Sequence, residues 1–183
     1  MKDRVVSAGP DAPIDIETER LAIRALGAGD EERLQRVFAA CADHFTALTG
    51  QPGPAPDAAA QELAACLSTP GRQVAMLTMI GSGEDVGAVG WWAGNPQADR
   101  ALLGMLMIAS EYRRQGLARE ALEAVEVWVA GRGIAALRTA FQRRRLSVHP
   151  IVKALGFTEM SIREHALLGL AGAGISLWEK PVG

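Results

Sequence analysis

The chain has 183 residues, 49% hydrophobic and 22% charged, and a formal net charge of −2 at pH 7. This balance excludes a disordered chain and a strongly basic nucleic-acid binder, and the length is sufficient to bury a core. No apolar run reaches the length of a membrane span, and Cys41 and Cys66 lack the spacing of metal ligands. We therefore expect one cytoplasmic domain over residues 1–183, with a loose leader at 1–15 and with no metal, membrane or nucleic acid as partner.

The first part of the chain predicts one strand and two helices. Apolar and charged residues alternate over 18–24, which predicts a half-buried strand. A helix is expected to begin with Asp30 as its N-cap and to continue toward Phe45, because apolar residues recur at helical spacing. Proline cannot continue a helix, so the proline-rich stretch 51–56 separates it from a second, short helix at 57–67.

The second part of the chain predicts most of a sheet. Apolar runs predict strands at 74–80, 86–93, 101–108, 135–141, 160–165 and 175–178. The first three form an antiparallel meander, and the last two form a hairpin across the glycine-rich turn 171–174. An amphipathic helix begins at Leu117 and ends at Gly131, and a short helix covers 150–155. The order of elements indicates a fold of the α/β class with a mixed sheet (α+β) that is flanked by helices.

The segment from Met105 to Ala118 joins an apolar strand, a basic turn and the start of a helix. The first N–H groups of a helix have no partner within it, and the helix dipole favours an anion there. Gly116 lets a ligand approach the backbone, and Arg113 and Arg114 would add charge-assisted hydrogen bonds to a phosphate. The alternative is an ordinary solvated turn between a strand and a helix.

The hexapeptide 113–118, Arg-Arg-Gln-Gly-Leu-Ala, fits the signature Gln/Arg-x-x-Gly-x-Gly/Ala. With it the chain resembles the GNAT superfamily of N-acetyltransferases, of the bacterial type. Four further stretches are similar to the family in the same order along the chain: 18–21 with Arg24, 111–113, 154–157 and 178–181.

The resemblance implies a mainly antiparallel sheet that splays between the fourth and fifth predicted strands, 101–108 and 135–141. The pantetheine arm of acetyl-CoA would lie in that gap, with main-chain groups of Met107 and Ile108 bound to it. The pyrophosphate would lie on Arg113, Arg114, Gln115, Gly116, Leu117 and Ala118. A primary amine of a small molecule or a protein would attack the acetyl carbon directly, and the resemblance also allows a homodimer.

Two catalytic groups that the resemblance implies are missing. The strand 101–108 contains no carboxylate to act as base, and Val152 stands where many relatives carry a tyrosine that protonates the departing thiolate. Ser147 and His149 are the candidate replacements, because a hydroxyl can donate a proton and a histidine titrates near neutrality. Each also has a plain structural explanation, as a helix N-cap and as an exposed or capping histidine. A CoA-binding module of the same fold without catalysis is therefore the alternative function.

Other polar and aromatic residues have two explanations each. Asp43 and His44 are candidates for acceptor contacts, and the run 143–145 of three arginines is a candidate for phosphate or acidic-acceptor contacts, with solvation as the alternative. Trp91 and Trp92 are neighbours on one strand, so one faces the core and the other the opposite surface.

Overall fold

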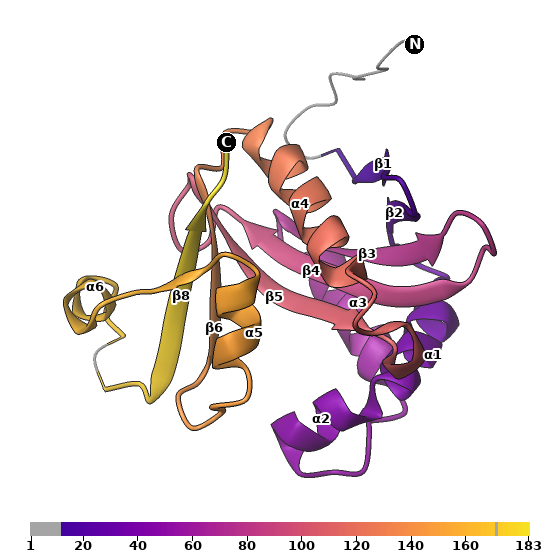
Figure 1. The fold of residues 1–183 in the computed structure, drawn as a ribbon, viewed down its shortest axis with the longest axis horizontal. Coiled ribbons are helices and arrows are strands. Elements are labelled where there is room, and N and C mark those ends of the chain that lie inside the picture. The colour runs from indigo at the N-terminus through magenta and orange to yellow at the C-terminus, as the bar shows by residue number, and fades with distance from the viewer. Residues whose placement is uncertain (1–11, 171) are drawn as a thin grey trace.

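A computed structural model describes residues 12–170 and 172–183, which form an eight-stranded sheet with helices on both faces (Figure 1). The strands are β1 (Asp15–Glu17), β2 (Leu21–Ala25), β3 (Arg72–Met79), β4 (Asp85–Ala93), β5 (Arg100–Ile108), β6 (Ala136–Gln142), β7 (Thr158–Glu159) and β8 (Ile175–Pro181). The helices are α1 (Glu31–Ala40), α2 (Ala42–Thr49), α3 (Ala58–Ser68), α4 (Leu117–Ala130), α5 (His149–Ala154) and α6 (Ile162–Leu167), with a 3-10 turn η1 (Ser110–Tyr112) before α4. The expected α/β class is confirmed.

The sheet has the order β1-β2-β3-β4-β5-β6-β8-β7 and is antiparallel except between β5 and β6. That parallel pair is short, since it joins only residues 100–102 to residues 136–138. Beyond these residues the two strands separate, while β4 remains paired with β5 as far as Ile108 (Figure 1). The sheet therefore splays at the predicted place and opens a gap between β5 and β6.

Two apolar cores lie on the two faces of the sheet. On one face, α1 and α3 pack through residues such as Leu34, Phe38 and Leu63. On the other face, α4 packs through residues such as Leu122 and Val125. Figure 1 shows α4 in front of the central strands and α1 and α3 behind them. Because successive side chains of a strand point to opposite faces, the central strands contribute to both cores.

The amino-terminal region differs from the expectation in where its strands begin. Residues 1–11 of the expected leader lie outside the described residues, but Ile14 is buried and Asp15 begins β1, so the end of that segment packs against the sheet. The strand expected over 18–24 begins only at Leu21, because Thr18 forms a turn in which its Oγ1 accepts a hydrogen bond from the Leu21 N–H at 2.9 Å.

The first helix also differs, because the chain breaks at Cys41 into α1 and α2. Asp30 precedes α1 but does not cap its N–H groups; its carboxylate instead accepts from the Gly27 N–H at 3.0 Å and pairs with Arg33. The acidic first turn of α1 still suits the helix dipole.

The predicted carboxy-terminal hairpin is wrong. Residues 162–167 form α6 rather than a strand, and β8 pairs instead with β6 and with the short β7. The cause is a capping box: Ser161 Oγ accepts from the Glu164 N–H at 3.3 Å, and the Glu164 carboxylate accepts from the Ser161 N–H at 2.6 Å. These bonds satisfy N–H groups in the first turn of a helix. They stabilise the helix more than the short apolar alternation stabilises a strand. The turn expected at 171–174 includes residue 171, which lies outside the described residues.

Over the part of the chain that the structure describes, no helix combines the length and the apolar character needed to cross a bilayer. Within the same residues, no cluster of three or more His, Cys, Asp or Glu side chains could hold a metal ion.

Candidate active site

The gap between β5 and β6 begins at a β-bulge on β5. In the pairing of β4 with β5, Gly104 is skipped between Leu103 and Met105. The extra residue reverses the alternation, so Leu103 joins the core beneath α4 while Met105 packs on the core beneath α1 and α3. Gly104 is exposed although its strand is central, and a Cβ placed on it would meet no atom within 4 Å. The bulge thus leaves open backbone where the two strands separate.

Main-chain groups at the end of β5 face two directions. The Met107 carbonyl oxygen lies against Gly87 of β4, where an added Cβ would collide with it, so it faces β4. The Ala109 N–H donates to the Val86 carbonyl of β4 at 2.9 Å. Since the N–H and C=O of a trans peptide point in opposite directions, the Ile108 carbonyl faces away from β4, on the side of the gap. Of the two residues expected to bind pantetheine, Ile108 is therefore the one with a carbonyl on the gap side.

The loop between β5 and α4 exposes backbone donors. Arg114 (φ 61°) and Gly116 (φ 84°) are left-handed, and the N–H groups of residues 115–118 donate to no acceptor in the described part of the chain. An arginine in this conformation costs on the order of 1 kcal/mol, which the surrounding structure must offset. The dipole of α4, a helix of 14 residues, adds positive potential at the same place. A cavity of about 310 Å³ lies against this loop, and Leu155 after α5 forms part of its wall.

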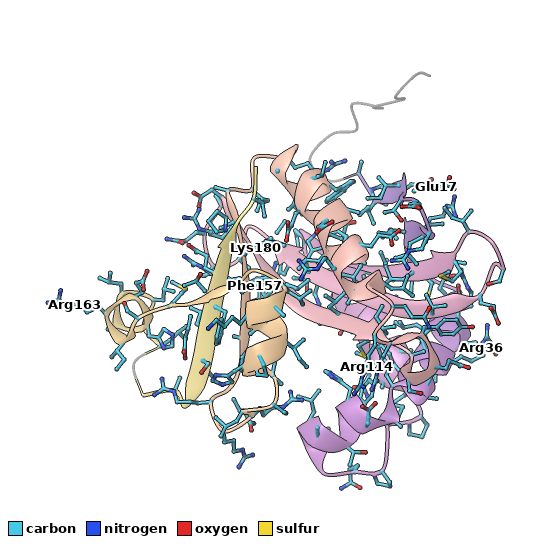
Figure 2. The ribbon with its side chains drawn as sticks, viewed as in Figure 1. Glu17, Arg36, Arg114, Phe157, Arg163 and Lys180 are labelled. Atoms are coloured by element: carbon cyan, nitrogen blue, oxygen red, sulfur yellow. The ribbon has the colours of Figure 1, made fainter. Side chains whose placement is uncertain are left out.

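The two arginines of this loop have different surroundings. The Arg113 guanidinium donates to both carboxylate oxygens of Asp43 on α2, at 2.7 and 2.8 Å, and its Nε donates to the Ile108 carbonyl at 2.8 Å. These bonds occupy the Arg113 side chain and lower the pKa of Asp43 to about 2. Arg114 is exposed at the amino-terminal end of α4 and has no ion-pair partner among the described residues (Figure 2). Arg114, rather than Arg113, is therefore available to an anion in the cavity.

A second cavity, of about 270 Å³, lies on the face of the sheet that α1 and α3 cover. The residues that matter in its wall come from α3 and three neighbouring strands: Glu62, Arg72, Trp92, Leu102, Gly104 and Met105. The Glu62 carboxylate accepts from Arg72 at 2.8 Å, and this ion pair lies beside an otherwise largely apolar wall. Because Gly104 is also the bulge residue, this cavity adjoins the β5–β6 gap from the side opposite α4.

The sheet opens at a bulge, and the neighbouring helix begins with unpaired N–H groups. A chain with these two features was compared with known protein families. The sequence profile of the acetyltransferase (GNAT) family matches residues 31–157. The chain belongs to the GNAT acetyltransferase family. No curated protein sequence matches the chain.

Solved structures share the GNAT fold of this chain. An acetyltransferase from Thermus thermophilus superposes with a TM-score of 0.72 at 24% identity, over 92% of this chain and 100% of that one. A probable GNAT acetyltransferase from Chromobacterium violaceum also gives 0.72, at 16% identity, over 99% and 94% of the two chains. The PaiA N-acetyltransferase from Thermoplasma acidophilum, solved in complex with coenzyme A, gives 0.62 at 16% identity, over 88% and 98%.

In this GNAT fold the two residues expected to act in proton transfer lie in different environments. Ser147 is exposed, forms no hydrogen bond through its hydroxyl within the described residues, and does not cap α5, whose N-cap is Val148. The His149 ring packs edge-on against Phe141 and Trp178, with ring centroids 5.2 and 5.6 Å apart. Its Nε2 is buried and has no partner among the described residues. His149 therefore packs in the core and also has a ring nitrogen that could transfer a proton. No contact of Ser147 supports a role in proton transfer.

The remaining candidates are placed as follows. Trp91 packs edge-on against Trp128 of α4, while Trp92 faces the opposite side, so the predicted division of the two tryptophans is confirmed. In the run 143–145, Arg143 donates to the Ile175 carbonyl, and Arg145 lies near His44 of α2. Burial lowers the pKa of that histidine, and Arg145 lowers it further.

Sequence reasoning did not identify Glu62. It is one acidic residue in a short helix, and its partner Arg72 lies ten positions along the chain, beyond a proline-containing turn. Only the packing of α3 on β3 places this carboxylate in a cavity beside β5. No local pattern in the sequence signals that relation.

Proposed function

We propose that this GNAT protein transfers the acetyl group of acetyl-CoA to a primary amine by direct attack. One observation carries the proposal: the N–H groups of residues 115–118 have no acceptor among the described residues, and Gly116, Leu117 and Ala118 line a cavity at the start of α4 beside the β5–β6 gap. Backbone donors at a helix N-terminus suit a pyrophosphate, and the absence of a Cβ at Gly116 keeps the approach open.

The residues present fit acetyl-CoA. The amides of Gln115, Gly116, Leu117 and Ala118, together with the Arg114 side chain, would hold the pyrophosphate. Main-chain groups of Ile108 would hold the pantetheine. Arg113 would keep the Ile108 carbonyl in place through its Nε, and Met107 would contribute its packing beneath the gap. When bound, acetyl-CoA supplies a thioester as the acyl donor.

The acceptor would occupy the cavity that contains Glu62 and reach the gap at Gly104. Glu62 would bind the amine and accept its proton as the nitrogen–carbon bond forms. The carbon–sulfur bond then breaks, and His149, on the other face of the sheet, would give a proton to the departing thiolate. Ser147 is exposed in the segment before α5 and is kept as the alternative donor. Holding both reactants in place supplies much of the rate, so no covalent enzyme intermediate is needed.

The size and lining of the cavity support one class of acceptor. A volume of about 270 Å³ beside Trp92, Leu102 and Met105 suits a primary amine on a compact apolar body, whether free or at the end of a peptide. Because acetyl-CoA is an intracellular metabolite, we infer a cytoplasmic enzyme. The bacterial type and a homodimer are parts of the proposal that rest on the resemblance to the family.

A second candidate function is a CoA-binding module without turnover. It is favoured by the lack of any acid on β5 and by Val152 at the place of the family tyrosine. Both candidates require coenzyme A binding, and only the enzyme releases thiol when an amine is added.

The decisive experiment has two steps. Calorimetric titration with acetyl-CoA, ATP and NAD tests the cofactor, and binding of acetyl-CoA alone is expected. Thiol release is then measured with phenethylamine, hexylamine, spermidine and a dipeptide as acceptors. No binding of acetyl-CoA would exclude both functions, whereas binding without release from any amine would favour the module.

A further inference from the structure

The turn between β1 and β2 packs on the first turn of α4. The Glu120 carboxylate accepts three hydrogen bonds from this turn: from Thr18 Oγ1 at 2.5 Å, from the Arg20 N–H at 2.9 Å and from Arg20 Nε at 2.7 Å. Residues about one hundred positions apart are thus joined at the helix N-terminus. Burial of the carboxylate opposes its charge, but the bonds from Thr18 and Arg20 hold the pKa of Glu120 below its ordinary value.

The same Arg20 side chain contacts the loop that precedes α4. Its Nη1 donates to the Gln115 carbonyl at 2.8 Å, and its Nη2 would lie 3.4 Å from a Cβ added to Gly116. One guanidinium therefore bonds both to the helix, through Glu120, and to the loop, through Gln115.

These contacts favour anion binding in two ways. A phosphate requires amide N–H groups in front of it and carbonyl oxygens turned away, and the bond to Arg20 fixes the Gln115 carbonyl away from the ligand. A carboxylate in the first turn of α4 would repel a phosphate, and the Arg20 guanidinium, 2.6 Å from Glu120, offsets that charge. Arg20 also lies at contact distance behind Gly116, whose positive φ of 84° is the reason that a side chain at 116 is disfavoured.

We propose that Thr18, Arg20 and Glu120 are positioning residues that hold the loop 114–118 in its phosphate-binding conformation. This inference rests on the proposed function, because it requires that the loop binds the pyrophosphate of coenzyme A. The three residues do not touch the ligand; they act through the Gln115 carbonyl and the first turn of α4.

The test uses the full chain, coenzyme A as the probe and two matched sets of variants. Arg20→Gln, Glu120→Gln and Thr18→Val each remove part of the network, while Thr18→Ser keeps the hydroxyl. Arg24→Gln and Glu123→Gln are controls, because Arg24 of β2 pairs with the exposed carboxylates of Asp15 and Glu17 on β1, and Glu123 lies on the exposed face of α4.

We expect the network variants to weaken coenzyme A binding about tenfold or more by calorimetry, as for loss of a charge-assisted hydrogen bond. Thr18→Ser and both controls should bind like the unaltered protein. In thiol-release assays, the KM for acetyl-CoA should rise more than kcat falls.

The outcomes separate the inference from the function beneath it. If the unaltered protein does not bind coenzyme A, the proposed function fails and the inference with it. If it binds, and the network variants bind equally well, the inference alone is overturned, even where their melting temperatures fall. Equal loss of affinity in Thr18→Ser and Thr18→Val would also overturn it, because the hydroxyl would then play no part.

Discussion

Arg113 holds the start of α2 against the end of β5. Its guanidinium makes a two-point contact with the Asp43 carboxylate, at 2.7 and 2.8 Å, while its Nε is bonded to the Ile108 carbonyl. Arg113, the first residue of the glycine-containing signature, thus bonds to a carboxylate 70 positions earlier in the chain and leaves the phosphate cavity to the backbone and to Arg114.

The Asp43–Arg113 pair predicts a pH-dependent part of the stability. The pKa of Asp43, about 2 in the folded chain, lies below its ordinary value, so its contribution is complete at neutral pH and is lost as the pH falls from about 4 toward 2. The Asp43 side chain is 63% exposed, so we expect less than about 1 kcal/mol. Urea denaturation of Asp43→Asn should show this deficit at about pH 6 and a shrinking one below about pH 4. Asp57→Asn is the control, because that carboxylate bonds to Gln61 and to no cation among the described residues.

Gly116 predicts a selective loss of cofactor binding. Valine at a positive φ costs on the order of 1–3 kcal/mol wherever it is placed, so Gly94, with φ 75° and open space around it, provides the matched control. Gly116→Val and Gly94→Val should destabilise the chain similarly, but only Gly116→Val should abolish the thermal stabilisation by acetyl-CoA. Retained stabilisation in Gly116→Val would show that the pyrophosphate binds elsewhere.

Glu62→Gln should separate acceptor chemistry from cofactor binding. Loss of a general base lowers turnover by about 10²–10⁴-fold, so kcat/KM for the amine should fall by a factor in this range. The affinity for acetyl-CoA should stay unchanged, since Glu62 lies on the opposite side of the sheet from the phosphate cavity. Turnover equal to that of the unaltered protein would remove Glu62 from the mechanism.

His149 is tested by a pair of substitutions. Phenylalanine preserves the packing against Phe141 and Trp178 and should change the free energy of unfolding by less than about 1.5 kcal/mol, whereas alanine should cost about 3 kcal/mol. If the imidazole transfers a proton, His149→Phe should lower kcat by about 10²-fold or more at nearly full stability. If His149→Phe is stable and fully active, His149 contributes only packing and transfers no proton.

We expect the two cysteines of the folded chain to contribute little signal to a thiol-release assay. Burial, followed by the charge of Glu62, raises the pKa of Cys66 to about 11, and burial also raises the pKa of Cys41. Both thiols are therefore protonated at about pH 7.5 and should react slowly with iodoacetamide in the folded chain. Mass spectrometry after brief labelling should show little alkylation, and rapid labelling of either cysteine would contradict this burial.

Most helices and the central strands could be predicted from the sequence because their signals are local. The amphipathic pattern from Leu117 and the glycines after it define α4, and the turn residues between apolar runs define the meander. The order of strand, basic turn and helix at 105–118 likewise indicates an anion site from neighbouring residues alone. The capping box of Ser161 and Glu164 is also a local signal, and it favours α6 over the hairpin that the apolar alternation predicts.

The partners of individual side chains were decided only by the tertiary structure. Arg113 is bonded to Asp43, Arg20 to Gln115 and Glu120, and Glu62 lies in a cavity beside Gly104, because separate elements pack side by side. A backbone conformation depends mainly on a residue and its neighbours, and the sequence displays that directly. A side-chain bond depends on which distant element supplies the other atom, and only the packed sheet and its helices determine that.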